Sequence, residues 1–237
     1  MSEAQVKTEY SLLSKLAAEF LGTAGLLIAV IGPMVLFNVV IGAKIEIAIL
    51  VDALAVVFIL YVLIETFGPI SGAHFNPVVS TVMVILGKLK AKDACLYIPT
   101  QIIGAITGVA LAQLMFYSNP GLNIILTISK VQRSGSDYLG EFLGTFTLLM
   151  VILILVHRGS KNVPIAVAFI VGSFFFATSS TMFANPAVTL ARMLTYTAAG
   201  VRPMDGLVFI VMEFIGGLTA LAVWKLFFQT PKTIIPQ

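Results

Sequence analysis

Two short apolar segments that each begin with Asn-Pro constrain the fold of this chain more than any other feature. They cover 76–86 and 185–196, and both are too short to cross a lipid bilayer, which takes about 20 helical residues. Asparagine is a preferred N-cap, and proline is tolerated at the first helical position because its missing N–H would have no partner there. Short capped helices in an apolar chain predict re-entrant segments, which occur where the backbone is buried in protein or lines a cavity.

Longer apolar stretches surround these two segments and indicate that the chain lies in a lipid bilayer. Hydrophobic residues make up 59% of the 237 residues and charged residues 11%, which is more apolar surface than a soluble domain of this size can bury. We expect membrane-crossing helices at about 12–37, 45–67, 93–117, 138–157, 163–181 and 204–229. The predicted fold class is an all-α membrane protein with six transmembrane helices and two re-entrant half-helices.

An internal duplication places the two short segments at corresponding positions. Three pairs of segments match: Glu19-Phe-Leu-Gly-Thr with Glu141-Phe-Leu-Gly-Thr, Gln101-Ile-Ile-Gly with Glu213-Phe-Ile-Gly, and Asn76-Pro-Val-Val with Asn185-Pro-Ala-Val. Each half then contains three spans and one half-helix. An odd number of spans gives the halves opposite orientations, which predicts an inverted repeat with a site at the membrane midplane. We expect one domain over 1–237, with repeats at about 10–118 and 136–230.

The placement of lysine and arginine predicts the orientation in the membrane. With a cytoplasmic N-terminus, the inner segments carry Lys7, Lys15, Lys88, Lys90, Lys92, Arg158, Lys161, Lys225 and Lys232. The outer segments carry Lys44, Lys130, Arg133, Arg192 and Arg202. Because basic residues are enriched in cytoplasmic loops, this excess predicts that both termini are cytoplasmic.

The two half-helices predict a pore for uncharged molecules. Helix N-termini that meet at mid-membrane leave N–H groups unpaired and place the positive ends of two dipoles at the centre, which repels cations, protons included. The side-chain amides of Asn76 and Asn185 can donate hydrogen bonds to a neutral polar molecule at that point. The alternative interpretation is that both asparagines only cap their helices.

Two acidic residues occupy equivalent places within predicted spans. A carboxylate inside a membrane is costly and needs partners, so Glu19 and Glu141 predict either a proton relay or hydrogen bonds to the backbone of the loops before the half-helices. Their duplication favours the second interpretation. His74 either lines the inner mouth of the pore or braces the loop, and Glu65 is assigned no role.

No cofactor, metal site or enzyme chemistry is predicted. The two histidines, His74 and His157, are far apart without metal-ligand spacing, and Cys95 is the only cysteine. The sequence has no basic runs with interleaved aromatic residues, which argues against nucleic-acid binding. No nucleophile, base and metal ligands occur within reach of one another in the sequence.

The segments at 71–80 (SGAHFNPVVS) and 181–189 (TMFANPAVT) resemble the two pore motifs of the aquaporin, or major intrinsic protein, family. With the glutamates of the first and fourth spans, the similarity covers essentially the whole chain. It implies that two half-helices meet at mid-pore through Asn76, Pro77, Val78, Asn185, Pro186 and Ala187. It also implies a homotetramer in contact with lipid, with one pore per subunit, and similarity to bacterial members implies the cell membrane.

The family's second constriction lies toward the outside and uses four positions. Its usual arginine directly follows the second Asn-Pro-Ala, and here that position is Val188, with the other three positions near Val56, Ser173 and Met182. Valine in place of arginine predicts a wider and more apolar opening. An apolar wall raises the cost of removing water from a small polar solute, so larger neutral molecules such as polyols should gain relative to water.

A group of bacterial aquaporins associated with arsenic-resistance genes is similar in having this valine within Asn-Pro-Ala-Val-Thr, with Ala-Arg following. That resemblance implies arsenite, as uncharged arsenous acid, among the solutes. Arg192 lies one helical turn beyond Val188 on the same face, where it either attracts anions such as methylated arsenicals or extends to the membrane interface, as such arginines more often do.

Two alternatives remain open from the sequence. One is an ordinary water-selective channel, because backbone positions set the aperture. The other is a secondary transporter, because inverted repeats with broken helices also serve that class. Coupled transport needs titratable or ion-binding groups at the midplane, where this sequence places two asparagines.

Overall fold

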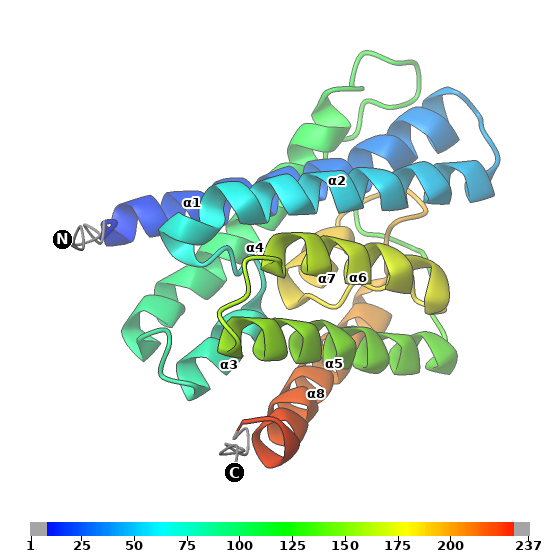
Figure 1. Cartoon of the computed structure of the whole chain (residues 1–237). Helices are drawn as coiled ribbons and strands as arrows, with labels where there is room; N and C mark the ends of the chain where they lie inside the picture. The colour runs from blue at the N-terminus through cyan, green and yellow to red at the C-terminus, as the bar shows by residue number, and fades with distance from the viewer. Residues whose placement is uncertain (1–8, 230–237) are drawn as a thin grey trace, which may run out of the picture.

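The computed structural model describes residues 9–229, and this part of the chain is helical with irregular connections and no strand. Lys7 and Lys232, which entered the orientation prediction, lie outside the described residues. The helices, in chain order, are α1 (Leu12–Pro33), its π-helical continuation η1 (Met34–Val40), α2 (Ile45–Ser71), α3 (Pro77–Ile85), α4 (Ala91–Leu114), α5 (Gly135–His157), α6 (Val163–Ala177), α7 (Pro186–Arg192) and α8 (Pro203–Phe227) (Figure 1).

Five of these segments are long and apolar enough to cross a membrane within the described residues: α1 with η1, α2, α4, α5 and α8. The shorter apolar helix α6 has 15 residues and ends at Ala177 rather than at the expected residue 181. Thr178 ends it, because its hydroxyl donates to the carbonyl oxygen of Phe174 at 2.7 Å and accepts the N–H of Met182 at 3.1 Å. The chain then continues through residues 178–185 to α7 without helical structure.

The two halves pack in the same way. α1 lies against α4 in the first half and α5 against α8 in the second, while α2 contacts α6 across the halves. Equivalent glycines allow both close approaches, since a Cβ on Gly104 would lie 2.6 Å from the carbonyl oxygen of Phe20, and one on Gly216 would lie 2.5 Å from that of Phe142. Replacing either glycine would therefore push two membrane helices apart.

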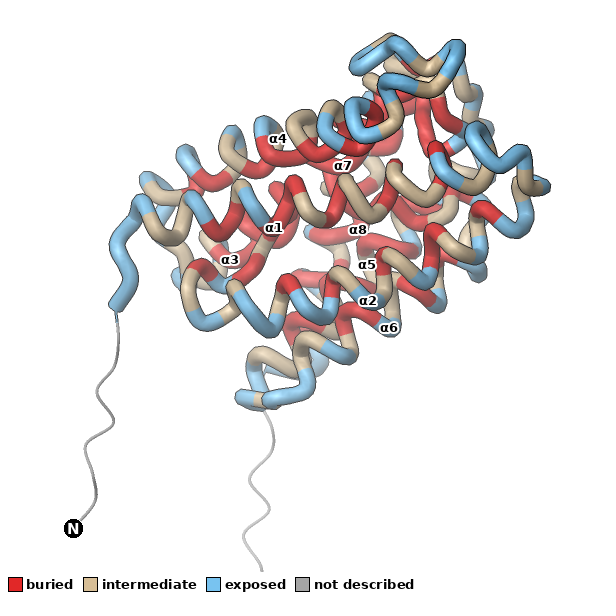
Figure 2. The backbone as a smooth tube through the Cα atoms, turned by 90° about the horizontal axis from the view of Figure 1, so that it is seen from above, coloured by how far each residue is buried: buried red, intermediate tan, exposed pale blue. Residues whose placement is uncertain are grey.

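The half-helices α3 and α7 lie between these helix pairs. Each contacts helices of both halves, because α3 packs on α4 and α8 and α7 packs on α8 and α4. Buried residues line the inner sides of all the helices, and exposed residues lie on the outward sides (Figure 2). The half-helices thus occupy the centre of the molecule.

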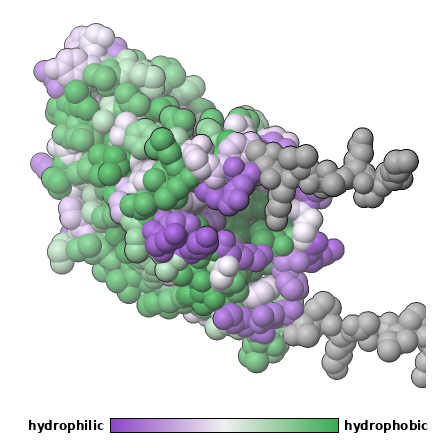
Figure 3. All heavy atoms as spheres, turned by 90° about the vertical axis from the view of Figure 1, so that its left-hand side faces the viewer, coloured by the Kyte–Doolittle hydropathy of each residue, from purple (hydrophilic) through white to green (hydrophobic). Residues whose placement is uncertain are grey.

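The outward faces of the long helices are strongly apolar. Large side chains such as Phe58, Ile103, Phe169 and Val211 are each more than half exposed. An apolar surface this continuous needs a lipid environment in place of water. Figure 3 looks onto one end of the bundle, where polar residues gather around a hollow and the flanks are apolar. These features are those of a multi-pass membrane protein.

Candidate functional site

The two half-helices begin at mid-molecule with the same capping arrangement. Asn76 precedes α3, and its side-chain oxygen accepts the N–H of Val78 at 2.9 Å. Asn185 precedes α7, and its side-chain oxygen accepts the N–H of Ala187 at 3.0 Å. Proline follows each asparagine as the first helical residue, where it sacrifices no hydrogen bond. Helix capping is therefore one function of both asparagines.

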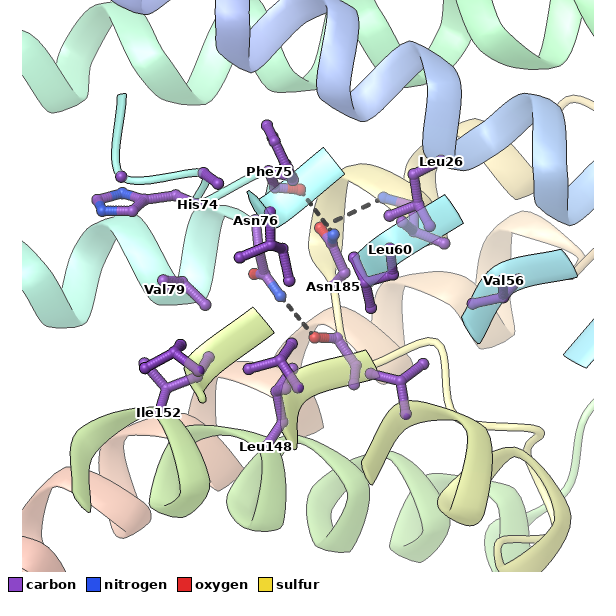
Figure 4. A pocket seen from close by; sticks show the side chains of 18 of the residues that line it. Leu26, Val56, Leu60, His74, Phe75, Asn76, Val79, Leu148, Ile152 and Asn185 are labelled. Carbon is purple, nitrogen blue, oxygen red and sulfur yellow. Dashed lines mark hydrogen bonds between the residues drawn. The ribbon is translucent and has the colours of Figure 1, made fainter. Parts of the chain in front are cut away.

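Each asparagine also binds the loop that leads to the other one. The Asn76 amide nitrogen donates to the carbonyl oxygen of Ala184 at 2.8 Å, and the Asn185 amide nitrogen donates to that of Phe75 at 2.7 Å. These reciprocal bonds hold the two helix N-termini together (Figure 4). Because a carboxamide nitrogen has two hydrogens, each asparagine keeps one donor for a molecule in the cavity.

The loops before the half-helices have an unusual backbone that is repeated in both halves. Ala73 and Phe75 in the first loop have φ of 47° and 49°, and Met182 and Ala184 at the equivalent places have φ of 47° and 49°. Left-handed backbone is unfavourable for residues other than glycine and persists only where surrounding contacts hold it. Each loop therefore requires a brace.

Buried carboxylates supply that brace. Glu19 accepts the N–H groups of His74 and Phe75 at 3.0 and 2.7 Å, and Glu141 accepts those of Phe183 and Ala184 at 2.9 and 2.7 Å. Both carboxylates are inaccessible to solvent. This geometry matches the backbone-binding interpretation, and neither carboxylate lines the cavity as a proton relay would require.

Both asparagines line a cavity of about 370 Å³. One end, here called the His74 end, includes His74, Lys88 and Leu89, and the other, the Arg192 end, includes Arg192. In Figure 4, His74 and Val56 lie on opposite sides of the asparagine pair. Leu26 and Leu60 face Leu148 and Ile152 across it, so the walls beside the central amides are apolar.

His74 lines the cavity, and its ring also holds its loop against the helices α3 and α4. Its Nδ1 lies 3.1 Å from the hydroxyl of Ser80, and its ring meets the ring of Tyr97 edge to face. The two interpretations of this residue therefore apply together.

Three of the four residues predicted for the constriction line the cavity. Val56, Met182 and Val188 are 3–4% exposed and face it from α2, the second loop and α7. The prediction of Ser173 is wrong, because this residue is exposed and lies off the cavity. The cavity face of α6 repeats every four residues through Val163, Val167, Val171 and Phe175. Ser173, two residues from Val171, points the opposite way.

The other residues of the two Asn-Pro motifs support the helix packing and do not contact the cavity. Pro77, Val78, Pro186 and Ala187 are buried and lie off the cavity. Val78, larger than the equivalent Ala187, packs toward α8, where Gly217 leaves room for it: a Cβ on that glycine would overlap Val78 Cγ1. The extra bulk of valine is thus accommodated at the helix contact and does not narrow the pore.

The sequence favoured an Arg192 side chain that extends to the membrane interface, and that prediction is wrong. Arg192 is 2% exposed and lines the cavity. Its guanidinium carbon lies 3.2 Å from the centre of the Phe183 ring, and its Nε donates to the carbonyl oxygen of Ala199. A cation stacked on an aromatic face and held by a carbonyl is fixed in place.

Two buried acids near Arg192 were missed as site residues. Asp52 is 2% exposed in α2, and Glu213 is fully buried in α8. A charged residue within an apolar span was the signal for both, since such residues are rare in membranes and face the interior. Glu65, by contrast, is exposed on α2, and Cys95 is exposed on α4.

Comparisons with known proteins agree with this architecture. A sequence model of the major intrinsic protein family matches residues 6–182. Aquaglyceroporin AqpS of Rhizobium meliloti (strain 1021) is 38% identical over 229 residues, which is 97% of this chain and 96% of that protein. Glycerol uptake facilitator protein-like 6 of Lactiplantibacillus plantarum is 38% identical over 160 residues, or 65% of this chain and 68% of that protein.

A solved structure has the same fold. The aquaglyceroporin from Plasmodium falciparum superposes with a TM-score of 0.67 at 21% identity, covering 90% of this chain and 96% of that one. The paired half-helices, the duplicated glutamate braces and the matching sequences lead to one conclusion: this chain belongs to the major intrinsic protein family, whose members are channels and not enzymes.

Proposed function

We propose that this protein is a passive channel for small uncharged solutes, with glycerol-like polyols and arsenous acid favoured relative to water. The observation that carries the proposal is that three apolar residues, Val56, Met182 and Val188, line the cavity. The relatives named for glycerol support the polyol part of this assignment.

The lining suits a molecule with both apolar and hydroxyl-bearing sides. The valines and leucines of the wall contact carbon atoms at no desolvation cost, while the amides of Asn76 and Asn185 donate hydrogen bonds to hydroxyl oxygens. The half-helix N-termini oppose cations at the same point. Arsenous acid is uncharged at neutral pH and carries three hydroxyl groups, as glycerol does, so the same lining accepts it.

The surroundings of the channel follow from the same assignment. We place it in the cell membrane as a single domain of two inverted repeats, with both termini cytoplasmic and the His74 end of the cavity inside. A homotetramer with one pore per subunit, its outer surface in contact with lipid, is consistent with the apolar outward faces of the helices.

Light scattering from proteoliposomes tests the proposal. Vesicles are mixed with an impermeant sugar, then with glycerol at the same osmolarity, and empty vesicles provide the baseline. The proposal expects shrinkage followed by reswelling in glycerol that is faster than the baseline, and uptake of arsenous acid in a parallel assay. Fast shrinkage without faster reswelling would establish a water-selective channel instead. Flux that saturates and requires an ion gradient would indicate a transporter.

A further inference from the structure

This inference rests on the proposed function and concerns how the channel selects its solute. Val56 and Val188 form an apolar ring, and each is followed by a charged residue one helical turn farther from the asparagine pair. α2 runs from its start past Val56 toward Ser71 and the first loop, so Asp52 lies beyond Val56. α7 starts at the asparagine pair and runs away from it, so Arg192 lies beyond Val188. Four residues of helix correspond to about 6 Å in both cases.

The Arg192 guanidinium is anchored on one side and free on the other. Phe183 lies under its plane, and Nε donates to Ala199. Among the described residues, its two terminal amino groups have no acceptor. A guanidinium has five N–H donors, so four of them remain for a molecule in the cavity that Arg192 lines.

Asp52 lies one helical turn beyond Val56, as Arg192 lies one turn beyond Val188, and does not bind Arg192 directly. The charges of the two side chains interact, yet within residues 9–229 no ion pair or hydrogen bond joins them. Asp52 Oδ1 is buried and has no hydrogen-bond partner in the same range. A buried acid without a hydrogen-bond partner is costly, and the positive charge of Arg192 offsets part of that cost.

The surrounding charges argue against an anion site. Glu141 and Glu213 also act on Arg192, and Arg133 is the one other cation among the described groups that act on it. Three buried acidic side chains near one cavity-lining guanidinium make its surroundings less favourable for an anion. Its donors are then suited to neutral hydroxyl groups, and an oxyanion gains little there.

We propose that the polar part of the outer constriction is displaced by one helical turn, so that Arg192 binds hydroxyl groups of a neutral polyol before the solute enters the Val56–Val188 ring. Arg192 is then a specificity-determining residue and Asp52 a positioning residue. Separating the polar contact from the apolar ring lets a solute keep its hydrogen bonds on one face while its carbon atoms meet the valines. Solutes with more hydroxyl groups gain most from this arrangement.

The test compares two solutes in the same proteoliposomes: glycerol, and 1,3-propanediol, which lacks the middle hydroxyl. Because both cross the same vesicles, the ratio of their channel permeabilities does not depend on how many channels folded. Arg192→Met should lower the glycerol-to-propanediol ratio by roughly tenfold, the effect of losing hydrogen bonds to a charged donor. Arg133→Gln should leave the ratio unchanged, because Arg133 also lies over Phe183 but does not line the cavity.

Two further variants keep the test decisive if Arg192→Met fails to reconstitute. Arg192→Lys keeps the charge but replaces the planar set of donors with one ammonium, and we expect the ratio to fall several-fold. Asp52→Asn leaves Arg192 intact but removes the acidic group one turn beyond Val56, and the glycerol-to-propanediol ratio should fall about threefold.

The outcomes separate the two proposals. Absence of glycerol flux through the unmodified protein above empty vesicles would refute the assignment as a polyol channel and leave no ratio to explain. Glycerol flux with a ratio that stays within twofold of the unmodified protein in Arg192→Met, or in both Arg192→Lys and Asp52→Asn, would refute the displaced polar site alone.

Discussion

In the first half of the molecule, the carboxylate of Glu19 receives a hydrogen bond from the amide of Gln101, whereas in the second half Glu213 occupies the position equivalent to Gln101. Gln101 Nε2 donates to Glu19 at 2.8 Å and to the hydroxyl of Ser80 at 2.9 Å. Glu213 instead accepts a bond from the hydroxyl of Thr189 at 2.6 Å, and its second oxygen has no partner among the described residues.

The difference shows how a duplicated scaffold diverges. Both halves keep the part that holds the left-handed loops, namely a glutamate that accepts two backbone N–H groups. The residue that packs behind this glutamate, Gln101 in the first half and Glu213 in the second, differs between the halves. In the second half that residue is a second buried acid near Glu141, and Arg192 is a cation near both. The second half thus buries a glutamate at the position where the first half buries a glutamine.

The largest expected effect is removal of either brace. Glu19→Ala and Glu141→Ala each leave two buried N–H groups without an acceptor and release left-handed loops. A hydrogen bond to a charged group contributes about 1.5–3 kcal/mol, so we expect a loss of roughly 3 kcal/mol or more of stability from either change. Thermal aggregation in detergent, followed by size-exclusion chromatography, measures it.

The control for both changes is Glu65→Ala, which removes a glutamate from the exposed face of α2 and should have little effect. A variant of Glu19 as stable as the unmodified protein, beside a strongly destabilised variant of Glu141, would break the equivalence of the two halves.

The next largest effect is expected at the constriction. Val188→Arg restores a guanidinium at the end of α7 nearest the asparagine pair and fills the opening between Val56 and Met182. Glycerol permeability should fall about tenfold or more, and water permeability by a smaller factor, because the wider solute is excluded first. Stopped-flow scattering measures both on one preparation.

Two substitutions calibrate that result. Val188→Ala leaves the opening wide and should not lower glycerol permeability. Ser173→Phe adds bulk on the outward side of α6 and should change neither permeability. Loss of glycerol flux in Ser173→Phe would mean that α6 presents a different face to the pore.

Exchanging the second-layer residues sharpens the comparison directly. Gln101→Glu places a second carboxyl beside Glu19 with no nearby cation, and we expect destabilisation of about 1–3 kcal/mol. Glu213→Gln gives the second half the arrangement of the first, and its stability should stay unchanged or rise slightly. Melting temperatures of the two variants and the double exchange measure this; equal effects in both directions would contradict the asymmetry.

The smallest effect is expected at the one motif position where the halves differ in size. Val78→Ala makes the first half match Ala187 and leaves a small void against Gly217, at a cost of about 1–2 kcal/mol. Permeability to water and glycerol should stay the same because Val78 lies off the cavity. A changed permeability ratio would show that Val78 shapes the pore after all.

Much of this arrangement could be predicted from local signals. The length and apolarity of the spans, the duplicated glutamates and the two Asn-Pro caps indicate the helices and their pseudo-symmetry, because each depends on residues adjacent in the chain. Val56, Met182 and Val188 were located from the motif positions and line the cavity. The exit from α6 was placed four residues late, because Thr178 ends the helix through hydrogen bonds that apolarity does not reveal.

The sequence by itself determined the features that depend on residues close together in the chain. These are the membrane location, the eight helical segments and the apolar residue where the family has arginine. What only the tertiary structure decided is which side chains meet. Ser173 faces outward, Val78 fits over a glycine of another helix, and Arg192 is buried on Phe183. These outcomes depend on helix rotation and on the tertiary packing of side chains, and no local pattern specifies either of them.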